Sequence, residues 1–178
     1  MITEFLKGNP EVIHHIFNDD GRFPNNPLPL LIYKGAMELP ADQEASASVV
    51  EKLFEMNNWK NSWRNGIYDF HHYHSITHEV LGIYSGAAIV QLGGPGGISV
   101  SISKGDIIII PAGVAHKNLE EKNDFKCVGA YPDGKNYDMN YGDKDERPKA
   151  DENIKNVPLP DLDPLYGNEG PLHKFWKN

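Results

Sequence analysis

The chain has 178 residues, of which 25 are acidic and 17 are basic, so its formal net charge is −8. This length predicts a single domain around one core. The acidic excess, without a cluster of basic residues, argues against nucleic acid as a partner. The longest apolar run, 107–115, is far shorter than the roughly 20 residues of a membrane-spanning helix, so we expect no membrane association.

Cys127 is the only cysteine, so one chain can form neither a disulfide nor a zinc–thiolate cluster. Residues 1–7 lack the basic leader and the apolar stretch of a secretory signal. Both features predict a cytoplasmic protein.

We expect residues 1–41 to form an extended arm, because the prolines at 24, 27, 29 and 40 forbid a long helix. Within the arm, residues 28–33 are apolar strand material that can pair with a sheet edge. Residues 42–58 predict one amphipathic helix, packed against the sheet through its apolar stripe. The stripe consists of Ala45, Val49, Val50, Leu53, Phe54 and Met56.

The segment up to residue 131 shows short strand patterns separated by turns. Apolar residues alternate with serine over 98–103, which is the clearest strand in the chain. The glycine-rich segment 93–97 predicts a hairpin turn; no Gly-Lys-Ser/Thr follows it, so it is not a phosphate loop. The pattern indicates an all-β sandwich or barrel. The predicted strands are 67–74, 79–84, 87–92, 98–103, 107–110 and 125–131.

The tail, residues 132–178, is rich in proline, aspartate, glycine and lysine and has no helical or strand period. It predicts extended coil, with disorder near 143–153. Residues 159–176 carry too many leucines and aromatics to remain in water, so we expect them to wrap this subunit or a partner.

Four side chains suggest a metal centre. His72 and His74 occupy positions i and i+2 of a predicted strand, so both imidazoles can face one ion. Glu79 follows a short turn, at the start of the next strand, where antiparallel pairing can bring it alongside them. His116 is remote in sequence but can be adjacent in a rolled sheet. The flanking His71 and His78 are expected to be surface residues or to support ligands.

These residues resemble the two motifs of the cupin superfamily. The first motif is matched by Gly66, His72, His74, Glu79 and Gly86, which are separated in turn by five, one, four and six residues. The start of the second motif is matched by Gly105, by Pro111-Ala112-Gly113 after five intervening residues, and by His116 after two further residues. The second motif usually ends in asparagine, and Glu120 stands there instead, at a position that is not a ligand in the family. The sequences His71-His72-Tyr73-His74-Ser75 and His78-Glu79-Val80-Leu81-Gly82 also resemble those of bacterial cupins of the YjlB type.

The resemblance implies a single cupin domain over 1–178, with its motif-bearing core at 66–131. The implied fold is a double-stranded β-helix, or jelly-roll barrel, with one flanking helix and an extended C-terminal tail. It also implies one divalent transition metal, Fe, Mn, Ni, Co or Zn, held by His72, His74, Glu79 and His116. Some seed-storage relatives keep the barrel without the metal, but their ligand set is usually eroded, whereas all four residues are present here.

Two functions remain open from the sequence. The first is a metal-dependent enzyme, dioxygenase-like or isomerase-like, in which Tyr68, Phe70 and Tyr131 line a pocket for a small molecule. Their alternative role is that of core aromatics. The second is a non-catalytic module that binds or senses a small metabolite or a metal. The arm around residues 28–33 is a candidate contact for a homodimer.

Overall fold

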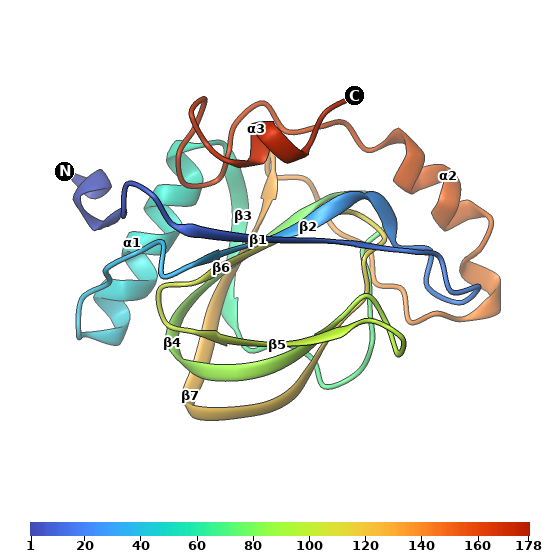
Figure 1. Ribbon diagram of the computed structural model, residues 1–178, viewed down its shortest axis with the longest axis horizontal. Helices are drawn as coiled ribbons and strands as arrows, with labels where there is room; N and C mark the ends of the chain where they lie inside the picture. The colour runs from blue at the N-terminus through green and yellow to red at the C-terminus, as the bar shows by residue number, and fades with distance from the viewer.

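The computed structural model describes residues 1–178, which form one curled antiparallel sheet (Figure 1). The strands hydrogen-bond in the order β1-β2-β6-β4-β7-β3, and β5 pairs with β4 off this path. This arrangement confirms the predicted all-β jelly roll. The strands are β1 (Glu11–Phe17), β2 (Asn26–Lys34), β3 (Trp59–Asn65), β4 (Glu79–Leu92), β5 (Ile98–Ser103), β6 (Ile107–Ile110) and β7 (His116–Pro132).

The helices lie outside the curled sheet (Figure 1). More than one helix flanks it, so the prediction of a single flanking helix was wrong. None of them has both the length and the apolar character needed to cross a membrane. They are α1 (Gln43–Met56), α2 (Lys149–Asn156) and α3 (Leu172–Phe175), with short 3₁₀ helices η1 (Ile2–Phe5) and η2 (Lys144–Glu146).

The first third of the chain folds largely as its pattern predicts. Part of the arm pairs with the sheet edge, since β2 lies between β1 and β6. Helix α1 begins after Asp42, whose Oδ1 accepts a hydrogen bond from the backbone N–H of Ala45 at 2.7 Å. The buried side includes Ala47 but not Met56, which is 52% exposed. Met56 was wrongly placed in the apolar stripe, because the buried side is turned toward Ser46 and Ala47.

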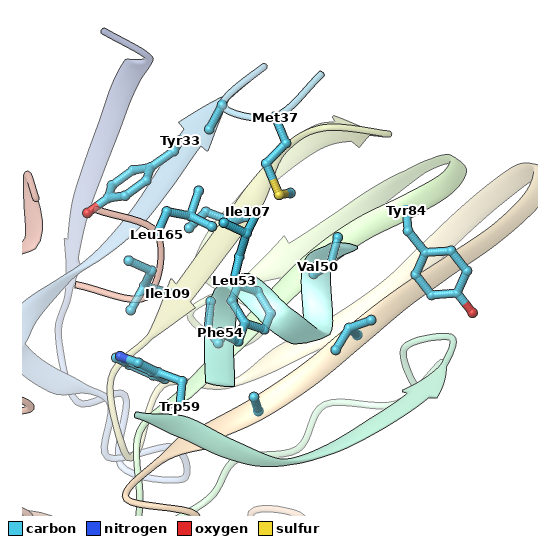
Figure 2. Packing of buried hydrophobic residues seen from close by; sticks show 14 of the residues in the cluster. Tyr33, Met37, Val50, Leu53, Phe54, Trp59, Tyr84, Ile107, Ile109 and Leu165 are labelled. Atoms are coloured by element: carbon cyan, nitrogen blue, oxygen red, sulfur yellow. The ribbon is translucent and has the colours of Figure 1, made fainter. Parts of the chain in front are cut away.

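Two apolar cores lie on opposite faces of the sheet. The outer core, between the sheet, α1 and the tail, contains Ile107 and Ile109, together with Leu53 from α1 (Figure 2). The inner core fills the interior of the curled sheet and contains Ile108 and Ile110. Strand β6 is therefore covered on both faces, which explains its uninterrupted isoleucines.

The predicted strand 67–74 is not formed as a strand. Only His72 and Tyr73 make isolated bridges, His72 with His116 and Tyr73 with Asn140. The segment changes partner between these two neighbouring residues, from β7 to the tail, so no continuous ladder can develop.

Three further strand boundaries differ from the prediction. The expected strands 79–84 and 87–92 are one strand, β4, bulged around Ser85 and Gly86. Gly86 has φ +67°, and a Cβ there would lie 2.6 Å from two backbone carbonyl oxygens. Strand β7 begins at His116, not at residue 125, and β3 was not predicted, because its sequence is mostly polar.

The tail is more ordered than predicted. Residues 144–156 contain η2 and α2, so the expectation of coil and disorder near 143–153 was wrong. Helix α2 buries Ala150, and Ile154 packs against the small apolar cluster that contains Ala150 and Phe23, so tertiary contacts stabilise a segment with little intrinsic period. Leu165, Leu172 and Trp176 enter the outer core, which confirms that the tail wraps its own subunit.

Candidate metal centre

Three histidines meet inside the curled sheet. His72 and His74 belong to the loop before β4, His116 is the first residue of β7, and all three are buried. Two backbone hydrogen bonds, of 3.2 and 2.9 Å, join His72 to His116 and place their ring centroids 4.1 Å apart. Each imidazole has a nitrogen within 4.8 Å of one in each of the others. Residues that are distant in sequence therefore converge on one point.

Backbone carbonyls orient all three rings. A carbonyl oxygen can only accept a hydrogen bond, so a carbonyl facing Nδ1 fixes the ring proton there and leaves the Nε2 lone pair free when the ring is neutral. The contacts are His72 Nδ1 to Phe70 O at 3.0 Å, His74 Nδ1 to Asp138 O at 2.6 Å, and His116 Nδ1 to Val114 O at 3.1 Å.

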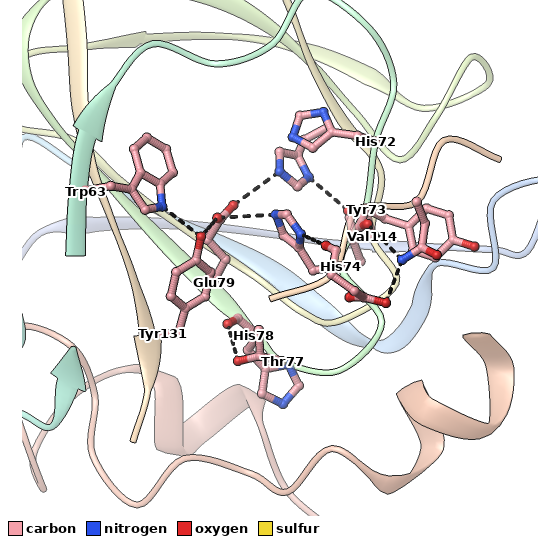
Figure 3. A network of polar contacts seen from close by, with 12 residues as sticks. Trp63, His72, Tyr73, His74, Thr77, His78, Glu79, Val114 and Tyr131 are labelled. Atoms are coloured by element: carbon pink, nitrogen blue, oxygen red, sulfur yellow. Dashed lines mark hydrogen bonds and ion pairs between the residues drawn. The ribbon is translucent and has the colours of Figure 1, made fainter. Parts of the chain in front are cut away.

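Glu79, the first residue of β4, supplies a buried carboxylate beside two of these rings (Figure 3). Its Oε2 lies 3.3 Å from His74 Nε2, and its Oε1 lies 3.2 Å from His116 Nε2. The structure therefore brings all four predicted residues into one cluster.

The electrostatics of the cluster favour an ionised carboxylate. Burial alone would raise the pKa of Glu79, but the adjacent His74 and His116 hold it well below its usual range. Burial opposes the charged form of His74 as well, yet the Glu79 carboxylate raises the pKa of that ring. Burial, with His116 nearby, lowers the pKa of His72 to about 3, so this imidazole is neutral at pH 7.

This donor set fits a divalent transition metal. Imidazole nitrogens and a carboxylate oxygen are ligands for Fe, Mn, Co, Ni and Zn. An ion bonded to nitrogens at about 2.1 Å needs them within a few ångströms of one another, as the three imidazoles are. The rings are already directed by their Nδ1 contacts, so the four residues could hold an ion without rearranging the backbone.

A cavity of about 370 Å³ opens onto the four residues. This volume is near the lower end for pockets that bind small molecules. Its other walls combine polar residues, among them Arg64, Asn65, Glu121 and Lys126, with aromatic and apolar ones. The latter include Trp63, Ile67, Tyr68, Leu81, Phe125, Tyr131, Tyr137 and Met139.

The three aromatics predicted to line a pocket have different environments. Tyr131 is buried and lines the cavity, and its hydroxyl donates a hydrogen bond to Glu79 Oε2 at 3.0 Å. Tyr68 lines the cavity at its exposed side, 55% exposed, with its ring 5.3 Å from that of His72. Phe70 is 38% exposed and stacks on Tyr68, outside the cavity lining. Only Tyr131 is also a core aromatic.

The tail supplies part of the site, which the sequence did not predict. Tyr137 stacks on Tyr131 at 5.1 Å and meets the edge of His74 at 5.2 Å. Asp138 accepts from His74 through its carbonyl and from Ser75 N–H and hydroxyl through its carboxylate. The contacts with His74 and Ser75 link positions more than sixty residues apart, and no local pattern in the tail signals them.

The flanking histidines take other roles. His78 is buried, and its Nδ1 accepts a hydrogen bond from Ala112 N–H at 2.9 Å, so that nitrogen is not free for a metal. His71 packs its ring against Phe23 at 5.6 Å. Neither ring belongs to the cluster of three histidines.

A curled antiparallel sheet with these motif residues gathered inside it is a cupin. The chain is 40% identical over 163 residues to the Bacillus subtilis (strain 168) protein "Uncharacterized protein YjlB", covering 91% of this chain and 94% of that protein. It therefore belongs to the YjlB family of cupins. No family model matches the chain.

Solved structures show weaker likenesses. Acireductone dioxygenase from Bacillus anthracis, with a cadmium ion in its active centre, is 15% identical over 73% of this chain and 83% of its own, with a TM-score of 0.41. A DUF861 family protein from Thermotoga maritima is 26% identical over 52% and 92%, with a TM-score of 0.31. The 3,5-epimerase RmlC from Legionella pneumophila is 14% identical over 68% and 71%, with a TM-score of 0.34.

Proposed function

We propose that this protein is a metal-dependent enzyme that holds one divalent transition metal through His72, His74, Glu79 and His116 and acts on a small molecule. The observation that carries the proposal is the convergence of three buried imidazoles, each with its Nδ1 against a carbonyl, beside an ionised carboxylate and an open cavity. A bound metal would act as a Lewis acid, or as a redox centre, in dioxygenase-like or isomerase-like chemistry.

The chain's own residues prepare the site for that chemistry. The carbonyls of Phe70, Asp138 and Val114 keep the rings oriented, and the two imidazoles beside Glu79 keep it ionised. Aromatic and aliphatic side chains form part of the cavity wall beside the candidate ligands. Burial of the cluster strengthens each electrostatic interaction within it.

The cavity suits a small ligand that does not rely on an arginine. Arg64 lines the wall, but its guanidinium is bound to Glu51 at 2.7 Å and to Glu44 at 2.7 Å. We propose that Tyr68 and Tyr131 contact the substrate within the cavity, and that Phe70, which lies outside the lining, supports the ring of Tyr68 on which it stacks. Tyr137 joins them, because it lines the same wall.

The proposal predicts that the purified protein carries about one transition metal per chain. The double variant His74→Ala/His116→Ala should lose it, because two of four ligands are removed. The matched control is His14→Ala/His15→Ala, which removes two exposed histidines of β1 and should retain the metal. Elemental analysis of all three proteins is the measurement, and equal metal in wild type and His74→Ala/His116→Ala would reject the proposal.

A module that binds a metabolite without turning it over is the alternative. Metal-dependent consumption of a substrate distinguishes the enzyme from saturable binding without turnover. A homodimer and a cytoplasmic location remain predictions from the sequence.

A further inference from the structure

Two aromatic side chains form a hydrogen-bonded chain that ends on Glu79 (Figure 3). Trp63 Nε1 lies 2.7 Å from the Tyr131 hydroxyl, which lies 3.0 Å from Glu79 Oε2. An indole N–H can only donate and an ionised carboxylate can only accept. The direction is therefore fixed: Trp63 donates to Tyr131, and Tyr131 donates to Glu79.

The backbone holds this chain of donors in place. Trp63 on β3 lies opposite Gly129 on β7, and a Cβ at Gly129 would lie 2.2 Å from the indole ring. The missing side chain therefore creates the slot that the indole occupies. Tyr131 follows two residues later on the same strand, and Tyr137 stacks on its ring. The phenol is thus held at its hydroxyl by the indole N–H and on its ring by a second aromatic side chain.

A fixed donor matters for a ligating glutamate. Its long side chain loses rotamer freedom when it binds an ion, and that loss weakens binding unless the side chain is already held. The Tyr131 hydroxyl donates a hydrogen bond to Oε2, while Oε2 stays beside the imidazole of His74 and Oε1 stays beside that of His116.

We propose that Trp63 and Tyr131 are a positioning pair that orients Glu79 and thereby sets the metal affinity of the site. The inference rests on the proposed function, because it requires that Glu79 binds the metal. Trp63 acts only through Tyr131, so the two residues form one unit. Removing the hydrogen-bonding partner of a metal ligand typically lowers metal affinity about 10- to 100-fold.

Cobalt(II) is the probe for the test. Its affinity is measured by competition with a chelator, and its visible absorption spectrum reports the geometry of its ligands. Tyr131→Phe should lose about 10- to 100-fold in Co(II) affinity and change the spectrum. Trp63→Phe should also lower the Co(II) affinity and change the absorption spectrum, each by a smaller amount than Tyr131→Phe. The double variant should resemble Tyr131→Phe alone, because the indole has no other route to Glu79.

Matched controls remove the same groups elsewhere. Tyr33→Phe deletes a buried hydroxyl that donates to the carboxylate of Asp163 at 2.6 Å. Trp59→Phe deletes an indole N–H that donates to Leu162 O at 2.9 Å. Both should lower the thermal midpoint of the metal-free protein and leave Co(II) affinity and the spectrum unchanged.

The outcomes separate this inference from the proposed function. If the wild type binds no Co(II), the proposed function fails and the inference falls with it. If the wild type binds Co(II) and Tyr131→Phe matches it in affinity and spectrum, only the inference is overturned. An equal loss in Tyr33→Phe also overturns it, because the effect would then be general destabilisation. Should Tyr131→Phe not fold, wild-type affinity in Trp63→Phe overturns the inference.

Discussion

At the scale of single residues, backbone contacts decide what each buried histidine can do. The rings of His72, His74 and His116 each meet a carbonyl at Nδ1, which leaves Nε2 for an ion. His78 has the opposite arrangement, because its Nδ1 accepts from the N–H of Ala112. One residue type therefore serves as a candidate ligand in three places and as a neutral structural acceptor in a fourth.

His78 should give the protein a measurable sensitivity to acid. Burial lowers its pKa from 6.5 to about 4, so between these values the unfolded chain binds a proton that the folded chain does not. The free energy of unfolding should therefore fall as the pH falls through this window, by up to roughly 3 kcal/mol from this residue.

Urea unfolding of the metal-free protein at several pH values between 7 and 4 measures this loss. His78→Asn, whose side-chain oxygen can still accept from Ala112 N–H, should show a shallower decline than the wild type. If the free energy of unfolding fell equally with pH in the two proteins, His78 would not be the source of the acid sensitivity.

At the scale of elements, local patterns predicted most of what was found. Helix α1 carries a helical repeat of apolar residues, and β5 alternates strictly, so both were expected close to their observed bounds. The errors lie where pairing is long-range. Residues 67–74 change partner within two residues, and β3 pairs with β7 although its residues are mostly polar. The local sequence pattern does not indicate which distant strand such a segment pairs with.

The contact between α1 and β4 gives a prediction at this scale. A Cβ at Gly82 would lie 2.5 Å from Val50 Cγ1 and 2.8 Å from Phe54 Cζ, both on the buried side of α1. Gly82→Ala should therefore lower the free energy of unfolding by about 1 to 3 kcal/mol, the usual cost of overpacking a core.

Gly96→Ala is the control, because a Cβ at Gly96 has no atom within 4 Å. Denaturant unfolding should show little change in this variant. Equal stability of the two variants would mean that α1 does not pack on β4 as closely as described.

At the scale of the whole molecule, the tail contacts both the outer face of the sheet and the candidate metal site. The buried carboxylate of Asp163 accepts from the hydroxyl of Tyr33 and from the backbone N–H groups of Leu165 and Leu172, which fixes the tail on the outer core. Farther back along the tail, Asp138 orients His74. From their apolar content, the last residues were expected to wrap this subunit or a partner. The contribution of Asp138 could not be expected, because it acts through a backbone carbonyl.

The four candidate ligands, by contrast, were all identified from the sequence. Motif spacing selected His72, His74, Glu79 and His116, and the fold brings them together even though the strand predicted for the first two does not form. The spacing could not select Trp63 or Tyr137, whose positions depend on pairing and on the path of the tail.

The central claim is that these four residues hold one transition metal. X-ray diffraction from crystals of the purified protein, recorded above and below the absorption edge of the metal found by elemental analysis, tests it most directly. We predict one anomalous peak, within bonding distance of the Nε2 atoms of His72, His74 and His116 and of a Glu79 carboxylate oxygen. A bound metal that gives its peak elsewhere, or no peak between these side chains, would contradict the claim.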